Sequence, residues 1–212
     1  MRSKPERRTI DLSARRVGGE QLRWVVLLVA FLGACALAVE VNAADRPSAA
    51  RCGGALWRLK TLSDPQRKTV NLTPRNTTIA AIIDRVGPSV APTRRRTSFQ
   101  RQNWEVVAQV VSFRREGTDV RLILFDHGQY MSAAIPSPSC LSATTRDRTS
   151  IAGAWNRFAS GCGHATTDSQ PLGAVAYVSG IGFWNGRGRG AAPNGAELHP
   201  VTGFRAVVGC GR

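Results

Sequence analysis

Three strand-like runs in succession constrain the fold of this chain more than any other feature. Residues 104–114, 120–126 and 130–135 are rich in β-branched and aromatic side chains. Short polar segments with a glycine, 116–119 and 127–129, separate the runs. Such segments are typical of turns between antiparallel strands. The pattern therefore predicts a three-stranded meander.

A helix and two further strands are expected after the meander. The apolar positions that recur at helical spacing are Ile151, Ala154, Trp155 and Phe158. We expect Ser150 to cap this helix and Gly161 to end it. Residues 175–184 and 198–208 have the composition of strands. The order β-β-β-α-β-β is that of the OB-fold, a five-stranded Greek-key barrel with its helix between strands three and four.

We therefore predict an α+β, mainly β fold, built as a small five-stranded OB-like barrel. A five-stranded α+β sheet with a different winding fits the same order. Before the barrel, residues 57–78 form an irregular polar stretch. A helix is expected from Ile79, with Thr77 or Thr78 as its cap and Gly87-Pro88 at its end. These residues form a predicted N-terminal helical extension.

The first residues have the layout of an export signal, because a basic head precedes the apolar run 24–39. That run is short for a membrane-spanning helix. We expect cleavage after Ala43 or Ala44. An uncleaved signal anchor, which would contact the membrane through residues 24–39 only, and a lipoprotein signal ending at Cys35 stay open as alternatives.

The predicted organisation has three parts. Residues 1–43 are an export signal or signal anchor, residues 44–54 are a linker, and residues 55–212 are a single disulfide-stabilised domain. The expected location is periplasmic or extracellular after cleavage, or anchored to the membrane without it.

Four of the five cysteines lie after the predicted leader. An even number in an exported chain predicts two disulfides. We expect Cys52 to bond Cys210 and Cys140 to bond Cys162, because one bridge would then tie the ends of the domain and the other would clamp the helix. Free buried thiols are the alternative. No pair has the close spacing common in zinc sites.

The chain is strongly basic, with 29 Lys and Arg against 14 Asp and Glu. Residues 1–43 contain seven of the Lys and Arg and four of the Asp and Glu, so the remainder carries a formal charge of +12. Such a charge favours polyanions, for example nucleic acid, lipid headgroups or acidic envelope glycans. Only three of the basic residues are lysine, which also fits a coding bias toward arginine.

Four short motifs after the leader are distinctive. They are Trp57-Arg58-Leu59-Lys60-Thr61, Val70-Asn71-Leu72-Thr73-Pro74 with Thr77-Thr78, Ile135-Pro136-x-Pro138-x-Cys140, and Ala192-Pro193-Asn194-Gly195-x-Glu197-Leu198-His199-Pro200. Together they resemble an uncharacterised family of exported bacterial proteins. The resemblance implies an exported location and a single domain, and no activity. The family often has Asp-x-His where this chain has Asp119-Val120-Arg121. The loss of that histidine weakens the hypothesis that the two histidines of the family share a metal ion.

The last strand carries the candidate catalytic residues Glu197, His199 and Arg205. Side chains alternate along a strand, so these three are expected on one side. A metal site would need Glu197 and His199 as ligands together with Asp126 or His127 from the central hairpin. Hydrolysis of a phosphodiester would use the arginine. Alternatively, Glu197 and Arg205 form a structural pair and His199 packs beside its proline.

The segment between the last two strands is the candidate binding loop. Its glycines would let a ligand approach the backbone, and Arg187 and Arg189 would offer two guanidiniums to a phosphate. Trp184 and Asn194, near the ends of the loop, complete the predicted binding set. In an OB-fold the loop between strands four and five is one of two that hold ligands. A hairpin tip with solubilising charges is the alternative.

Three functions follow as hypotheses. The first is an exported, non-enzymatic binding domain whose ligand is a polyanion or another envelope component. The second is a metal-dependent nuclease or phosphodiesterase that uses Glu197 and His199. The third is a structural envelope protein. A divalent metal is expected only under the second, and no other cofactor is expected.

Overall fold

The computed structural model describes residues 52–54 and 56–210, which belong to one compact unit. The predicted leader and most of the predicted linker lie outside these residues. Within the described ranges, no helix is long and apolar enough to span a membrane.

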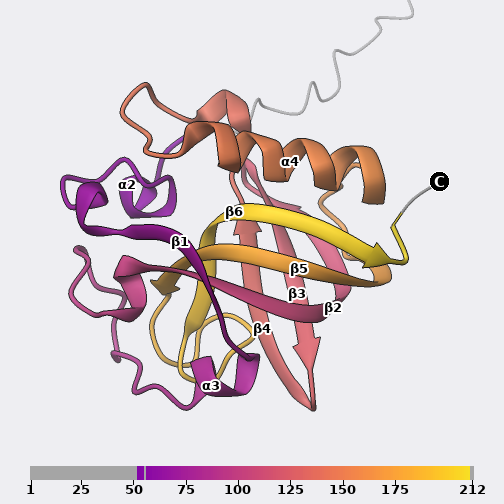
Figure 1. The fold of residues 1–212 in the computed structure, drawn as a ribbon, viewed down its shortest axis with the longest axis horizontal. Helices are drawn as coiled ribbons and strands as arrows, with labels where there is room; N and C mark the ends of the chain where they lie inside the picture. Colours follow the sequence, from indigo (N-terminus) through magenta and orange to yellow (C-terminus); the bar gives the residue numbers. More distant parts are fainter. Residues whose placement is uncertain (1–51, 55, 211–212) are drawn as a thin grey trace, which may run out of the picture. The chain divides into compact units, whose positions relative to one another are not determined.

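The fold is mainly β, with one mixed sheet of six strands and few helices (Figure 1). The strands are β1 (Asn71–Asn76), β2 (Gln102–Glu116), β3 (Asp119–Asp126), β4 (Gln129–Ile135), β5 (Gln170–Trp184) and β6 (Ala196–Val208). Strands β2 to β6 correspond to the five predicted strands. Their order along the chain, with a helix between β4 and β5, is as expected.

The prediction of five strands is wrong, because β1 is a sixth. The sheet order is β1-β2-β3-β4-β6-β5, and β5 also pairs with β2, so that the pairings of β2 to β6 form a closed ring. Strands β4 and β6 pair in parallel. The added strand β1 runs parallel to β2. The sequence did not reveal β1 because its side chains are mostly exposed and it contains Pro74, so no apolar alternation is visible.

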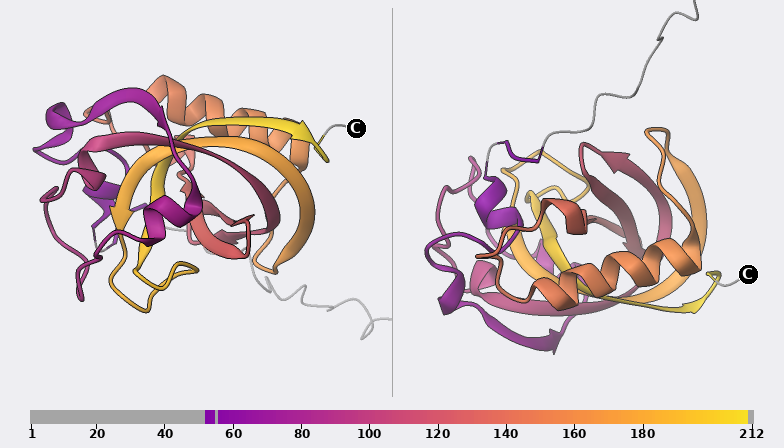
Figure 2. Two further views of the ribbon diagram at one scale, coloured as in Figure 1. Left: turned by 60° about the horizontal axis from the view of Figure 1, so that its bottom comes forward. Right: turned by 90° about the horizontal axis from the view of Figure 1, so that it is seen from above.

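The helices are α2 (Trp57–Lys60), α3 (Ile79–Ile83) and α4 (Arg148–Cys162), and single 3₁₀ turns occur at η1 (Arg67–Thr69), η2 (Phe99–Arg101) and η3 (Pro138–Cys140). Helix α4 lies across one end of the curled sheet and α3 lies at the other end (Figure 1, Figure 2). The predicted cap of α3 is confirmed, since the Thr78 side chain accepts a hydrogen bond from the Ala81 N–H at 3.1 Å.

Both helices differ from prediction at their ends. Helix α3 stops at Ile83, before Gly87-Pro88. Helix α4 begins at Arg148 with Asp147 at its N-cap position, so Ser150 does not cap it. The Ser150 hydroxyl instead donates to Asp147 Oδ1 at 2.6 Å.

The apolar core collects alternate residues of the strands and one face of α4. Ile151, Ala154 and Phe158 of α4 are buried, as predicted. The Phe158 ring meets Phe113 of β2 and Phe204 of β6 edge to face, at centroid distances of 5.1 and 5.3 Å. Edge-to-face pairs add to the gain from area burial. This contact fixes α4 across the sheet between the two strands.

Two disulfides are present, but their connectivity differs from the prediction. Cys52 is bonded to Cys140, and Cys162 is bonded to Cys210. The end of β6 lies beside the end of α4, so Cys210 meets Cys162 rather than the N-terminal cysteine. Each bridge closes a long loop, 88 and 48 residues in sequence. By loop-closure entropy each contributes about 4 to 5 kcal/mol to stability.

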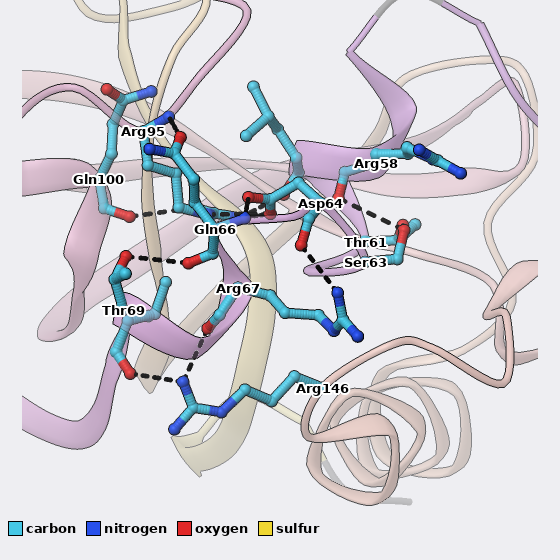
Figure 3. A network of polar contacts seen from close by, with 12 residues as sticks. Arg58, Thr61, Ser63, Asp64, Gln66, Arg67, Thr69, Arg95, Gln100 and Arg146 are labelled. Atoms are coloured by element: carbon cyan, nitrogen blue, oxygen red, sulfur yellow. Dashed lines mark hydrogen bonds and ion pairs between the residues drawn. The ribbon is translucent and has the colours of Figure 1, made fainter.

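A buried ion pair fixes the segment before β2. Arg95 is 1% exposed, and its Nε donates to Asp64 Oδ2 at 3.0 Å. Its other nitrogens donate to the carbonyl oxygens of Gln100 and Leu59 at 3.0 and 2.8 Å. The Arg95 backbone N–H donates to Gln66 Oε1 at 2.8 Å (Figure 3). One guanidinium therefore joins α2, the turn before η1, and η2.

Replacing Asp64 by asparagine should destabilise the fold strongly. The variant leaves the Arg95 charge buried without its carboxylate, and breaking a buried ion pair costs about 3 to 5 kcal/mol. Urea unfolding of Asp64→Asn against the parent chain measures this. Asp168→Asn, at an exposed loop position, is the matched control and should change stability by less than about 0.5 kcal/mol. A loss of under 1 kcal/mol in Asp64→Asn would contradict the assigned role.

Candidate functional site

Glu197 and His199 lie together at the start of β6, and both are fully buried, at 0% and 1% exposure. His199 Nδ1 is 2.9 Å from Glu197 Oε1. The sequence predicted their proximity from the spacing of two residues on one strand. It did not predict their burial.

Two neighbouring strands supply the remaining contacts of Glu197. Arg121 of β3 donates from Nη1 to Glu197 Oε2 at 3.0 Å, and Ser132 of β4 donates to the same oxygen at 3.2 Å. The sheet register causes this convergence, since Ser132 is level with Glu197 on one side and with Ile123 on the other. Arg121 lies two residues from Ile123 and so projects on the same face.

The cluster continues to the β2–β3 turn. His199 Nε2 is 3.2 Å from Asp119 Oδ2, an ion-pair distance. Arg121 Nε is 2.7 Å from Glu116 Oε2, and Arg114 Nη2 is 2.9 Å from the same oxygen. We call Asp119, Arg121, Glu197 and His199 the buried charge cluster. Its two carboxylates and two cationic groups compensate each other.

The pKa values follow from this arrangement. Burial alone would raise the pKa of Glu197, but the hydrogen bond from His199 and the charges of His199, Arg121 and Lys60 lower it to about 2. Burial alone would lower the pKa of His199, but its contacts with Asp119 and Glu197 raise it above 6.5. These contacts therefore favour the charged forms of both groups.

A cavity of about 370 Å³ opens beside the cluster. Its lining residues are Arg114, Glu116, Arg121, Ile123, Asn185, Gly190 and Ala191. Arg121 thus connects the buried charge cluster to the cavity, with 11% of its side chain exposed. Glu197 and His199 do not line the cavity. The arrangement can hold a polar ligand against Arg114 and Arg121, but it does not present Glu197 or His199 to it.

The predicted metal ligands do not meet. Asp126 and His127 lie at the β3–β4 turn, where the His127 side chain is 91% exposed and contacts Asp126. In the sheet register Asp126 is level with Gln129, whereas Glu197 is level with Ser132. Gln129 and Ser132 are three residues apart on β4. Three residues of strand span about 10 Å and reverse the face. Within residues 52–54 and 56–210, no group of three or more His, Cys, Asp or Glu side chains could hold a metal ion.

Arg205 does not join Glu197. Its guanidinium lies over the Tyr177 ring of β5, 3.8 Å from the centroid, and the residue is exposed. Alternation puts Glu197 and Arg205 on one side of β6, but eight residues of strand span roughly 26 Å. The predicted Glu197–Arg205 pair is therefore not formed, and Arg121 takes that role.

The predicted binding loop is partly structural. Trp184 is 1% exposed, packs on Phe99 and donates from Nε1 to Thr97 Oγ1 at 3.0 Å, so its ring is not free to stack on a ligand. Asn194 donates from Nδ2 to three carbonyl oxygens at the end of α3, those of Ile82, Ile83 and Arg85.

The same loop holds the two candidate arginines. Arg187 is exposed but donates to the Gly87 carbonyl oxygen at 2.9 Å. The loop can approach this closely because residue 87 is a glycine. A Cβ at that position would stand 2.0 Å from the backbone carbonyl oxygen of Asn194. Arg189 is exposed at the tip. Of the predicted binding set, Arg187 and Arg189 present charge to solvent.

Sequence reasoning missed Asp119 and Arg121 as members of the cluster. The signal was visible, since a spacing of two on a strand places both side chains on one face. Arg121 was interpreted only as the loss of a family histidine. In the structure, Arg121 is the cation that compensates the charge of Glu197.

Comparisons with known proteins give the following. No protein-family model and no curated protein sequence matches the chain. Among solved structures, a putative aspartyl-tRNA synthetase from Leishmania major Friedlin aligns over 66% of this chain at 12% identity, with a TM-score of 0.39. An asparaginyl-tRNA synthetase from Pyrococcus horikoshii aligns over 66% at 14% identity, with a TM-score of 0.33. The alignments span 22% and 24% of those two chains.

The buried charge cluster predicts how stability depends on pH. The pKa of Glu197 is lowered from 4.5 to about 2, so its contribution is present above pH 4.5 and is lost as the pH falls toward 2. This contribution is about 3 kcal/mol. The pKa of His199 is raised, so its contribution is present below pH 6.5 and is lost as the pH rises through the folded-state value. Urea unfolding from pH 2 to 9 should show a maximum between about 4.5 and 6.5.

The matched variants are His199→Gln and His127→Gln. Removing the buried imidazole should lower stability below pH 6.5 and flatten the decline above it, because Asp119 and Glu197 then lack their shared cation. Removing the exposed imidazole of His127 should leave the profile unchanged. Identical profiles for the two variants would contradict a charged His199.

Proposed function

We propose that this chain is an exported, disulfide-stabilised, non-enzymatic domain that binds a polyanion through surface arginines. The observation that carries this proposal is the distribution of ion pairs. In the described part of the chain, only Arg95, Arg114 and Arg121 lie within 4.0 Å of a carboxylate. The other arginines have no acidic partner there, and exposed ones such as Arg187 and Arg189 can meet an external anion.

The acidic residues support the same reading because many are used internally. Asp64 is 4% exposed and is paired with Arg95, while Asp119 and Glu197 belong to the buried charge cluster. Glu105 accepts a hydrogen bond from Ser179 at 2.6 Å. The basic excess of the sequence is therefore concentrated at the surface. A surface of one sign attracts polyanions over distances of about 8 to 10 Å at physiological salt.

We further infer that β2 to β6 form an OB-like barrel to which β1 is added outside. The closed ring of pairings, the parallel β4–β6 pair and the position of α4 between β4 and β5 support this inference. In such a barrel the outer face of the second and third strands and the loop between the last two are the binding region. Here these are the faces of β3 and β4 that carry Arg121 and Ser132, and the loop 185–195.

The cavity of about 370 Å³ lies in this region, between Arg114, Arg121 and Gly190. Among the lining residues two guanidiniums meet one carboxylate, Glu116, and Arg121 is also paired with the buried Glu197. Arg187 and Arg189 extend the positive charge along the loop. This geometry favours a polyanion that runs past the loop tip.

The alternative enzymatic function receives less support. Glu197 and His199 are buried and do not line the cavity, and Glu197 already accepts hydrogen bonds from Arg121 and Ser132, so they are not placed to reach a substrate. No observation favours a purely structural envelope role over binding. Two disulfides fit a protein of the periplasm or the cell exterior.

Binding to a polyanion should weaken linearly with the logarithm of salt concentration, because each neutralised anionic group releases counterions. A labelled single-stranded oligonucleotide is a suitable probe of regular charge spacing, followed by fluorescence anisotropy from 50 to 300 mM NaCl with the full-length chain. Arg189→Gln should reduce the salt slope by about 1.

Arg148→Gln is the matched control, since this exposed arginine starts α4, at the end of the sheet away from α3 and the loop (Figure 1). It should leave the slope unchanged. Equal reductions in the two variants would argue against the loop as the contact. Binding that does not depend on salt would overturn the polyanion proposal.

A further inference from the structure

A second cavity, of about 540 Å³, lies beside the start of β2. It is formed by β1, the residues after α3, η2 and the start of β2. Its lining residues are Arg75, Arg85, Ser98, Arg101, Gln102 and Trp104. Three are arginines, and none is acidic. Volumes of about 300 to 1,000 Å³ are usual for sites of small ligands.

Two of the arginines are held on the same indole ring. Arg85 lies 4.6 Å from the Trp104 centroid and 5.9 Å from that of Phe99. Arg75 lies 5.6 Å from the Trp104 centroid. The register explains this, because Arg75 of β1 is level with Trp104 of β2. The ring is itself fixed, since Trp104 Nε1 donates to the Phe99 carbonyl oxygen at 3.0 Å.

The third arginine and its neighbour are also anchored. Arg101 donates from Nε and Nη2 to the Arg95 carbonyl oxygen at 3.2 and 2.8 Å. Gln102 Nε2 donates to the carbonyl oxygens of Thr73 and Asn103 at 2.8 and 2.7 Å. These bonds position the cavity wall without supplying negative charge. The arginine side chains therefore need little reordering to receive a ligand.

The cations of the cavity lack compensation. Among the described residues, no carboxylate lies within 4.0 Å of Arg75, Arg85 or Arg101. The Nε of Arg85 is buried and has no hydrogen-bond partner. A buried donor without an acceptor is unfavourable, as is the mutual repulsion of like charges. Both costs are removed when an anion with several acceptor oxygens enters.

We propose that this cavity is a binding site for a phosphate group, either free or carried by a small phosphorylated ligand. A phosphate group carries a charge of about −1.5 to −2 near pH 7 and several acceptor oxygens. It can accept from three guanidiniums at once, whereas a carboxylate has one charge and two oxygens. Planar guanidiniums also suit the oxygens of phosphate better than ammonium groups do.

This site is separate from the proposed polyanion surface. It uses none of the loop 185–195, and its lining residues come from the segment before the ring and the start of β2. The inference therefore does not rest on polyanion binding. The two can be tested apart, because small anions probe the cavity and an oligonucleotide probes the loop.

The test is a titration of the ¹⁵N-labelled full-length chain with inorganic phosphate at constant ionic strength, followed through the backbone amide signals of Ser98 and Gln102. We expect saturable shifts. Arg75→Gln should weaken binding by at least about tenfold, because it removes one charged hydrogen-bond donor. Arg75 is exposed on β1, so the variant should fold, and dispersed signals elsewhere in the spectrum verify this.

Arg148→Gln, at the exposed start of α4 and outside the cavity lining, is the matched control and should bind phosphate like the parent chain. A parallel titration with glycerol 3-phosphate identifies the source, because tighter binding than that of inorganic phosphate indicates a phosphorylated ligand and equal binding indicates phosphate alone. Shifts that do not saturate, or equal affinity in Arg75→Gln and Arg148→Gln, would overturn the proposal. Saturable phosphate binding without salt-dependent oligonucleotide binding would remove the polyanion function and keep this site.

Discussion

The buried carboxylate of Glu197 is the constraint on which the arrangement of three strands depends. A carboxylate taken out of water must be matched by cations and hydrogen-bond donors, because an uncompensated buried charge costs several kcal/mol. Here β3 supplies Arg121, β4 supplies Ser132 and β6 supplies His199. A shift of β6 by one residue would turn Glu197 toward the core and Leu198 away from it. The charge cluster therefore reinforces the same register that the apolar core requires.

Local pattern was sufficient to locate the five strands β2 to β6 and α4, because period-two and helical spacing depend only on neighbours in the chain. It failed for β1, which is mostly exposed and, among the described strands, pairs with β2. It also failed where distance mattered, since alternation gives the face of Arg205 but not its separation from Glu197. Long-range partners decide such cases. The assignment of Arg121 as a compensating cation needed the fold, because its carboxylate lies 76 residues away in sequence.

The segment before β2 shows how a polar stretch becomes ordered without an apolar pattern of its own. Arg95 supplements a small apolar cluster there, formed by Leu62, Val70 and Ile181. Its buried guanidinium contacts Asp64 and the carbonyl oxygens of Leu59 and Gln100. The Cys52–Cys140 bridge adds a covalent tie to the region after β4. With the backbone fixed in this way, η2 and β1 hold their arginines in place, and the cavity around Trp104 keeps its shape.

The two proposals share one electrostatic cause. Acidic side chains are scarce in this chain, and the fold uses several of them to compensate Arg95, Arg121 and His199 inside. A carboxylate that is paired with a buried cation cannot also neutralise an arginine at the surface. Arginines outside must then be neutralised by solvent ions or by a ligand. Where they are spread along the loop, attraction is diffuse and sensitive to salt. Where three are anchored around one cavity, the same excess becomes a site with a defined shape, because the cost of ordering them is met by folding rather than by binding.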